Sequence, residues 1–205
     1  ADPGGYFIIN GSEKTILPQE RACENKVMCF NILKNNNKWN WLAEIKSVPI
    51  RKCISPKQIN MTIATKNNGY GHPLYIQIPR IKQPIPLFIL FRALGILSDQ
   101  DICKYILLNI KEAQKTNIIY SLKASIMEAS KYMSKEECVK YIVNYAMFTP
   151  INMDKEEGYK MKYNFTVNVL ENDLFPHCDT FQQKLYFLGY MTNKLIQTSL
   201  GWKKP

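Results

Sequence analysis

The pattern of hydrophobic and polar positions changes once along the chain, near residue 80. Before that point, β-prone runs of a few residues are separated by asparagine, proline or glycine, a spacing that predicts short strands. We expect these strands at Tyr6 to Ile9, Lys26 to Phe30, Leu42 to Lys46, Ile59 to Thr65 and Leu74 to Ile78. The last two flank a segment with Asn-Asn-Gly and a second glycine, which predicts a hairpin with a long loop.

From Ile85 onward the pattern is helical. Three helix starts carry candidate N-caps: Ser98 with Asp101, Ser134 with Glu137, and Thr180 with Gln183. The last two pairs fit the capping box, in which a hydroxyl accepts from a backbone N–H and the third residue onward bonds back. Further helices are expected around 116–130 and 159–170, and Gly201 suits the end of the last helix. The predicted fold class is α+β, with N-terminal β-strands and a hairpin followed by a bundle-like region of five or six helices.

Apolar residues after two of these caps recur at helical spacing. They are Val139, Ile142, Val143, Ala146 and Met147 after Ser134, and Phe181, Leu185, Leu188, Met191 and Leu195 after Thr180. Residues spaced in this way lie on one face of a helix, and such a face normally packs against the rest of the protein. We therefore interpret both stripes as core positions rather than cofactor contacts.

Length and composition are those of a globular domain. The chain has 205 residues, of which 46% are hydrophobic; this is enough for one good core, so disordered and fibrous classes are excluded. The longest apolar stretch, 85–97, is interrupted by Arg92 and is shorter than the roughly 20 residues of a bilayer span, so we expect no membrane helix. Nothing at the N-terminus resembles a secretory signal, and the start looks cut from a longer chain.

The chain is basic, with a formal net charge of +10. This charge favours a polyanionic neighbour, because lysine and arginine near phosphates release condensed counterions. The cations gather in three places: Lys46, Arg51, Lys52 and Lys57; Lys155, Lys160 and Lys162; and Lys203 and Lys204. For each group, a solvated face is as good an interpretation as a nucleic-acid contact.

A search for a self-contained active site finds none. The sequence has no phosphate-cradling Gly-x-x-x-x-Gly-Lys, no Gly-x-Ser-x-Gly elbow and no aspartate cluster of the kind that holds catalytic magnesium. His72 and His177 are interpreted as turn or capping residues without a nucleophile beside them. Arg92, inside an apolar helix, is expected to pair with a carboxylate or with carbonyls, because an unpaired buried charge is very costly.

The cysteines do not form a recognisable site. They lie at positions 23, 29, 53, 103, 138 and 178, with no Cys-x-x-Cys pair and no regular spacing, which predicts reduced thiols. A metal site would need clustered ligands, and the one close pair, His177 and Cys178, lacks a second pair. We therefore expect no cofactor in this stretch of chain.

Four stretches together resemble one known family. Residues 4–21 read GGYFIINGSEKTILPQER, and the stretches 42–47, 81–99 and 174–195 read LAEIKS, IKQPIPLFILFRALGILSD and LFPHCDTFQQKLYFLGYMTNKL. In this order and spacing they resemble the second-largest subunit of multisubunit DNA-directed RNA polymerases, in its eukaryotic or viral form, to which the bacterial β subunit is homologous. Pro18 departs from the family pattern, which usually has a small residue other than proline there.

The resemblance implies a division of the chain and a role for it. Residues 1–21 would be the C-terminal strand segment of the protrusion, 22–202 the lobe, and 203–205 the start of the linker back to the protrusion. The lobe would flank the DNA cleft as a non-catalytic module and contact the largest subunit, a small zinc-ribbon subunit and the dimerisation module of an initiation factor. Magnesium and zinc would belong to other parts of the holoenzyme, so this stretch alone would be inactive. Its location would be the nucleus, or a cytoplasmic virus factory or virion if the source is a large DNA virus.

Lys14 is the main candidate for nucleic-acid contact. Following the resemblance, the lysine of Asn-Gly-Ser-Glu-Lys lies along the cleft near the template strand of the RNA–DNA hybrid. A lysine on a rigid strand end offers a point charge to a phosphate without reading a base. Arg21, Arg51 and Lys52 are further candidates. Glu13 is close enough in sequence to compete for Lys14.

Two other classes of protein stay open at this point. Three residues, Gly11, Gly95 and Arg92, are expected to have structural roles. A free-standing basic helical adaptor would explain the charge and the lack of motifs, but not the four matching stretches. A compact hydrolase would need a nucleophile constellation that the sequence lacks.

Overall fold

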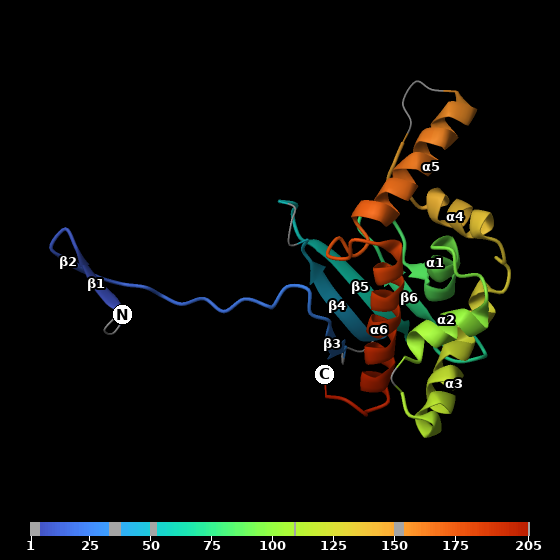
Figure 1. The fold of residues 1–205 in the computed structure, drawn as a ribbon, viewed down its shortest axis with the longest axis horizontal. Coiled ribbons are helices and arrows are strands. Elements are labelled where there is room, and N and C mark those ends of the chain that lie inside the picture. Colours follow the sequence, from blue (N-terminus) through green and yellow to red (C-terminus); the bar gives the residue numbers. More distant parts are fainter. Residues whose placement is uncertain (1–4, 33–37, 50–52, 109, 150–153, 205) are drawn as a thin grey trace.

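The computed structural model describes residues 5–32, 38–49, 53–108, 110–149 and 154–204. The described part contains a two-stranded hairpin, a five-stranded antiparallel sheet and six α-helices (Figure 1). The sheet and the helices share one hydrophobic core, to which the hairpin contributes no residue. The strands come first along the chain and the helices follow, so the α+β class predicted from the sequence is confirmed.

The main sheet has the strand order β3–β4–β5–β6–β7, so each strand pairs with its neighbour along the chain. Its strands are β3 (Met28–Asn31), β4 (Trp39–Ser47), β5 (Lys57–Ala64), β6 (Leu74–Gln77) and β7 (Ile85–Pro86). Ala43 lies opposite Met61 and both are buried, whereas Lys46 lies opposite Gln58 on the other face and both are exposed. This alternation is typical of an antiparallel sheet with one face packed and the other in water.

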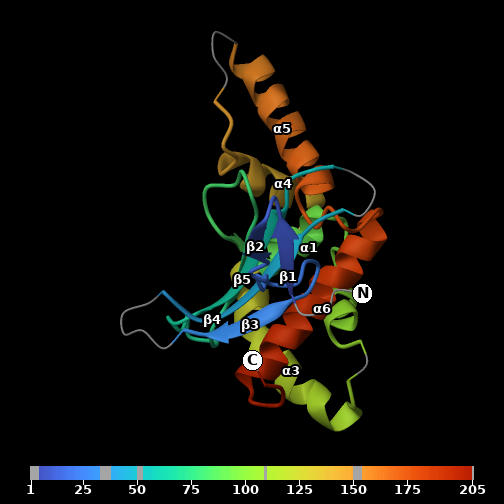
Figure 2. The same cartoon turned by 90° about the vertical axis from the view of Figure 1, so that its left-hand side faces the viewer.

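The helices cover the packed face of this sheet and one another. They are α1 (Leu87–Ala93), α2 (Asp99–Ile106), α3 (Glu112–Ala129), α4 (Lys135–Asn144), α5 (Lys155–Asn172) and α6 (Phe181–Ser199). α6 lies directly on the sheet, where Thr192 Oγ1 is 3.5 Å from Met61 Sδ. α2 packs beside α6, α1 is buried, and α5 extends away from the body (Figures 1 and 2).

The predicted helix ends are largely confirmed. Ser134 Oγ accepts from Glu137 N–H at 3.2 Å, and Thr180 Oγ1 accepts from Gln183 N–H at 3.2 Å, so both capping boxes are present. Gly201, with φ of +75°, follows the last turn of α6 and donates its N–H to the Thr198 carbonyl. Ser98 is the N-cap residue of α2, but its side chain makes no cap hydrogen bond.

The N-terminal segment differs from the sequence prediction. The hydrophobic pattern predicts one strand there, and the structure has two, β1 (Tyr6–Ile9) and β2 (Ser12–Thr15), paired as a hairpin. The turn consists of Asn10 and Gly11, whose φ angles are 52° and 75°. Two central residues with positive φ give the tight turn whose twist matches that of paired strands, and Asn-Gly is its preferred sequence.

The ends of both apolar stripes also differ from their prediction as core. Met147 is 54% exposed, because α4 ends at Asn144 and the helical spacing does not continue to it. Phe181 is 44% exposed at the first position of α6, before the helix reaches the sheet. The other members of the two stripes are buried.

Candidate nucleic-acid interface

The β1–β2 hairpin separates Lys14 from the nearest carboxylate. The pairing places Lys14 opposite Phe7 and Glu13 opposite Ile8. Residues directly opposite in an antiparallel pair share a face, and successive residues alternate between faces. Lys14 and Phe7 therefore lie on one face and Glu13 and Ile8 on the other. The competition from Glu13 considered above does not occur, and Lys14 has no ion-pair partner among the described residues.

The turn of the hairpin fixes which face Lys14 occupies. A β-carbon at Gly11 would meet nothing within 4 Å, so the requirement for glycine there comes from its positive φ and not from crowding. A slip by one residue would move every side chain to the opposite face. Gly95, which follows α1 with φ of +109°, has the same kind of conformational role and donates its N–H to the Arg92 carbonyl at 3.0 Å.

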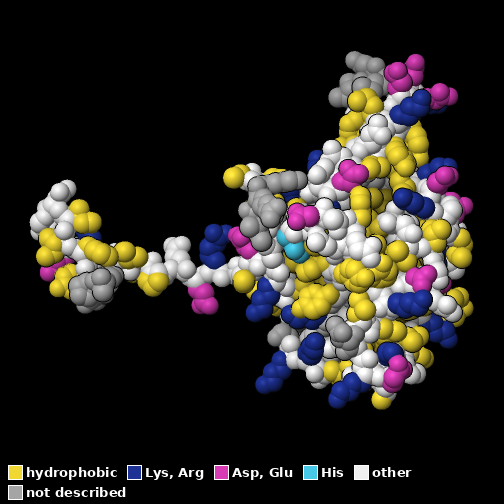
Figure 3. All heavy atoms as spheres, viewed as in Figure 1, with side chains coloured by type: hydrophobic (Ala, Val, Ile, Leu, Met, Phe, Trp, Pro, Cys, Tyr) yellow, Lys and Arg dark blue, Asp and Glu magenta, His cyan; other side chains and the backbone are white. Residues whose placement is uncertain are grey.

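An extended stem holds the hairpin away from the body. Residues 16–24 are exposed and lack regular structure apart from a turn at 24–25, and every residue of β1 and β2 is exposed (Figure 1). Arg21 lies on this stem. The stem ends at Asn25, whose side chain donates to the Val48 carbonyl at 2.9 Å and accepts from Val48 N–H at 2.8 Å. In the space-filling view, the hairpin is a separate body that carries mainly hydrophobic side chains (Figure 3).

The predicted basic loop is described only in part. Arg51 and Lys52 lie outside the described residues. Lys57 Nζ lies 3.5 Å from Asp173 Oδ1, and Arg80 also binds this carboxylate, donating from Nε at 2.5 Å. Asp173 is 2% exposed, so Lys57 serves an internal ion cluster and not a free surface. The sequence analysis missed Arg80 and Asp173, since nothing local links residues so far apart in the chain.

The two other basic groups lie on surfaces. Lys155 and Lys160 are exposed on α5, and Lys162 donates to the Asn144 carbonyl at 3.4 Å. Lys203 and Lys204 are exposed after α6.

Arg92 is the centre of a buried polar cluster. Its side chain is 1% exposed, and Nη2 donates to Asp99 Oδ1 at 2.6 Å. Nη1 donates to the carbonyls of Ala129 and Tyr132, at 2.6 and 2.5 Å. Arg92 thus connects α1 to the start of α2 and to the end of α3, which is a structural role. Because Arg92 holds Asp99, and Lys104 holds Asp101 at 2.7 Å, this pair of aspartates is not arranged to bind a cation.

His177 corrects one statement of the sequence analysis, because a serine hydroxyl does lie beside it. His177 Nδ1 is 2.6 Å from Ser47 Oγ, which also accepts from the His177 backbone N–H at 3.2 Å. Ser47 is fully buried, and His177 Nε2 is buried with no partner among the described residues. Burial, with a smaller effect of Lys184, lowers the pKa of His177. The pair joins β4 to the segment before α6, and because Ser47 is fully buried its hydroxyl is not exposed to a substrate, which argues against the hydrolase alternative.

Four of the six thiols are buried or half-buried, whereas Cys23 and Cys53 are exposed. All six cysteines are free, and burial raises the pKa of Cys103, Cys138 and Cys178 to about 11, so these three are protonated at neutral pH. Within the described ranges, histidine, cysteine and acidic residues form no group that could hold a metal ion. In the same ranges, no helix is long and apolar enough to cross a bilayer.

Comparison with known proteins covers the whole chain. A family model described as RNA polymerase Rpb2, domain 2, matches residues 23–205. The chain is 33% identical over 208 residues to the RNA polymerase II subunit RPB2 of Encephalitozoon cuniculi, a match that takes in all of the chain and 17% of the relative. It is 32% identical over 210 residues to RPB2 of Schizosaccharomyces pombe, covering all of the chain and 16% of that protein.

An archaeal relative matches in the same way. The chain is 30% identical over 207 residues to the polymerase subunit Rpo2N of Methanococcus vannielii, covering 98% of the chain and 37% of the relative. The hairpin and most of its stem precede residue 23, where the family match begins, but they fall inside the alignments to both RPB2 proteins. The chain thus corresponds to a small part of each of these relatives.

Proposed function

The chain belongs to the family of RNA polymerase Rpb2, domain 2, a part of the second-largest subunit, and we propose that it is the lobe of such a subunit together with the end of the protrusion. In this proposal it is a non-catalytic module that flanks the nucleic-acid cleft of a DNA-directed RNA polymerase. The single observation that carries its contact with nucleic acid is Lys14, an exposed cation without a carboxylate on its face of the hairpin.

Phosphate contact by Lys14 follows from its setting. The hairpin register fixes its direction, and the stem holds it away from the basic body. A lysine in this position attracts a phosphate whatever the base sequence of the nucleic acid, because it presents a point charge and no pattern of donors for base edges. Lys14 therefore positions the RNA–DNA hybrid or the template strand and does not select sequence. Arg21 on the stem is a second, weaker candidate.

The proposed boundary between the protrusion and the lobe lies within the stem. Residues 1–21 belong to the protrusion and 22–202 form the lobe, followed by the linker at 203–205. A hairpin whose residues are all exposed, and a family match that begins at residue 23, both support a boundary near there. The proposed partners are the largest subunit, a small zinc-ribbon subunit and the dimerisation module of an initiation factor.

Catalysis and its metal ions are assigned to other parts of the enzyme. The polymerase II relatives are eukaryotic, which supports the nucleus as the location and gives no support to a virus factory. The alternative of a free-standing basic adaptor accounts for the charge, but it does not account for similarity to polymerase subunits along the whole chain.

The salt dependence of an elongation complex tests the contact. We expect Lys14→Ala, introduced into the full subunit and assembled into polymerase on a transcription scaffold, to shorten the lifetime of the complex. Each lost phosphate contact reduces the slope of log binding against log salt by about one. Lys14→Arg keeps the charge and should retain the wild-type slope.

A matched control removes an exposed lysine at a helix start instead. Lys135→Ala, on α4, takes away the same charge without touching the hairpin. Equal slopes for Lys14→Ala and Lys135→Ala would contradict a specific contact. A loss of slope only in Lys14→Ala would support the assignment.

A further inference from the structure

A small apolar pocket lies at one end of the sheet, on the body and apart from the hairpin. It is formed where β4, the β5–β6 loop, α3 and the end of α6 meet, and its volume is about 280 Å³. Its lining includes Trp41, Ile63, Tyr70, Tyr120, Ile196 and Leu200. Sites for small molecules typically enclose about 300 to 1,000 Å³. This pocket is slightly smaller than that range, a size suited to one large side chain and not to a cofactor.

The loop that carries Tyr70 is held in place before any partner arrives. Asn67 Oδ1 accepts from Gly69 N–H and Gly71 N–H at 2.7 and 3.1 Å, and Asn68 Nδ2 donates to the Ala124 carbonyl of α3 at 3.2 Å. His72 Nδ1 is 3.0 Å from the Ala64 carbonyl at the other side of the loop. Binding to such a loop requires little ordering, which favours affinity.

Two tyrosines that line this pocket are exposed to solvent. Tyr120 is 74% exposed and Tyr70 is 48% exposed, although both line the hollow. Exposed tyrosines with an apolar ring and a free hydroxyl are enriched where proteins bind other proteins. Both rings would lose water contact on insertion of an apolar side chain between them.

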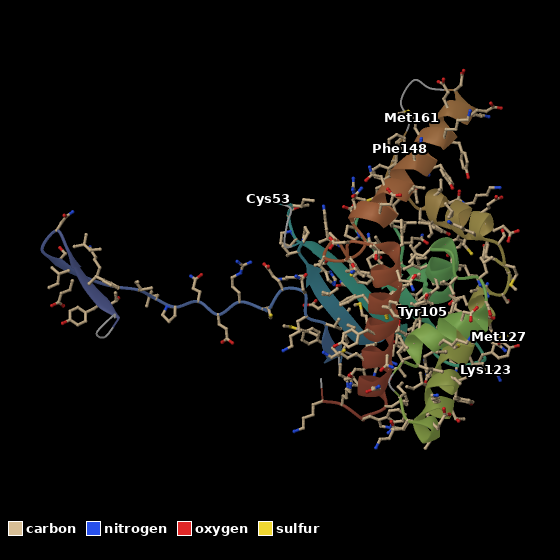
Figure 4. All side chains as sticks on the ribbon, viewed as in Figure 1. Cys53, Tyr105, Lys123, Met127, Phe148 and Met161 are labelled. Atoms are coloured by element: carbon tan, nitrogen blue, oxygen red, sulfur yellow. The ribbon has the colours of Figure 1, made fainter. Side chains whose placement is uncertain are left out.

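Three lysines lie near the pocket. Lys123 of α3 lies with Nζ 5.8 Å from the centre of the Tyr70 ring, on the outer side of the helix (Figure 4). Lys66 begins the same loop, and Lys38 accepts at its carbonyl from Thr65 N–H, which places it beside that loop. All three lysines are exposed, and the described residues that line the pocket include no aspartate or glutamate.

From this combination we propose that the pocket binds an acidic peptide segment of a partner protein, with one aromatic or large aliphatic side chain inserted between Tyr70 and Tyr120. The acidic residues on either side of that side chain pair with Lys66 and Lys123. An apolar hollow distinguishes this site from a surface for duplex DNA, whose phosphates need cations but no such hollow. The inference goes beyond the proposed function, because it uses neither Lys14 nor the stem.

Fluorescence anisotropy with three labelled peptides tests the proposal on the 205-residue chain. The first peptide consists of aspartate, glycine and serine with one central phenylalanine, the second has alanine in its place, and the third has the phenylalanine but lysine for every aspartate. We expect the first to bind about tenfold more tightly than the second, since an anchoring aromatic side chain typically contributes that much. The lysine peptide should not bind.

Two variants and a control locate the binding. Tyr120→Ala should weaken the first peptide about tenfold and remove its advantage over the second, while Lys66→Ala/Lys123→Ala should weaken both acidic peptides. Tyr190→Ala, at a residue that is 52% exposed on α6 outside the pocket, should change nothing. Tyr120 is exposed, so its removal leaves the core intact, and a thermal melt monitored by circular dichroism checks this.

Other outcomes would overturn the proposal. Equal binding of the phenylalanine and alanine peptides, or no effect of Tyr120→Ala, would mean that only charge is recognised. Displacement of the first peptide by an unlabelled DNA duplex that itself depends on Lys123 would assign the surface to nucleic acid. No binding of the first peptide at any accessible concentration would also contradict it. None of these results bears on Lys14, so the proposed function stands or falls separately.

Discussion

At the scale of single residues, burial decides which cations have a structural role and which are free for a partner. Arg92 and Lys14 are both positively charged, yet Arg92 is 1% exposed with three partners, whereas Lys14 is exposed and unpaired within the described residues. The sequence predicted the first of these roles, because an arginine in an apolar helix must find oxygen atoms. The sequence could not identify all of the oxygen atoms that Arg92 binds. Asp99 is close to it in the chain, but the carbonyls of Ala129 and Tyr132 come from segments about 40 residues away.

Removal of Arg92 should strongly destabilise the fold. Arg92→Ala leaves the Asp99 carboxylate and the carbonyls of Ala129 and Tyr132 without their donor, and breaking such a buried pair costs about 3 to 5 kcal/mol. Asp99 is partly exposed, which places the expected loss at the lower end of that range. Urea unfolding followed by circular dichroism measures the change, and a loss below about 1 kcal/mol would contradict the role of Arg92 as a connector.

At the scale of elements, helix ends were predictable from sequence and helix contacts were not. Ser134 and Thr180 are N-caps with their third residue bonded back, as their local sequence predicts. The Asn-Gly pair at Asn10 and Gly11 also carries a local signal, that of a tight hairpin turn. The strand after it, Ser12–Thr15, lacks the alternating apolar residues that predict a strand, so the sequence pattern does not indicate the second half of the hairpin. The close approach of α2 to α6 has no local signal, since it depends on packing between segments far apart in the chain.

The two serine caps should differ in their contribution to stability. Ser134→Ala removes a hydroxyl that accepts from Glu137 N–H, and loss of such a cap costs about 1 kcal/mol. Ser98→Ala occupies the same position on α2, but its hydroxyl makes no cap hydrogen bond, so we expect almost no change. Thermal or urea unfolding of both variants makes the comparison, and equal losses would show that the hydroxyl at Ser134 is not what stabilises α4.

Gly189 should tolerate no larger residue. A β-carbon there would lie 2.3 Å from the carbonyl oxygen of Tyr105 (Figure 4) and 2.7 Å from its carbonyl carbon, so α2 and α6 would have to separate. Overpacking of this kind costs about 1 to 3 kcal/mol. Tyr190→Ala, at the next and exposed position, is the matched control. A Gly189→Ala variant as stable as that control would show that the helices can move apart freely.

At the scale of the whole molecule, the body and the hairpin differ in how they are stabilised. The body has one continuous core beneath the sheet, whereas both faces of the hairpin are exposed, with Ile8 at 70% and Ile9 at 55%. A two-stranded hairpin is only marginally stable in water by itself. In the proposed setting, the face with Ile8 would pack on protein and the face with Lys14 would meet nucleic acid. The family could be identified from sequence, but the opposite directions of Glu13 and Lys14 required the pairing of β1 with β2.

Photo-crosslinking from the two faces of the hairpin tests the central claim most directly. Lys14→p-benzoylphenylalanine and Glu13→p-benzoylphenylalanine are each introduced into the full subunit, assembled into polymerase on a transcription scaffold with labelled nucleic acid, and irradiated. Because positions 13 and 14 point to opposite faces, we predict a crosslink to the template strand or the hybrid from position 14 and crosslinks only to protein from position 13. Nucleic-acid crosslinks of equal yield from both positions, or from position 13 alone, would contradict the assignment of the Lys14 face to the nucleic-acid cleft.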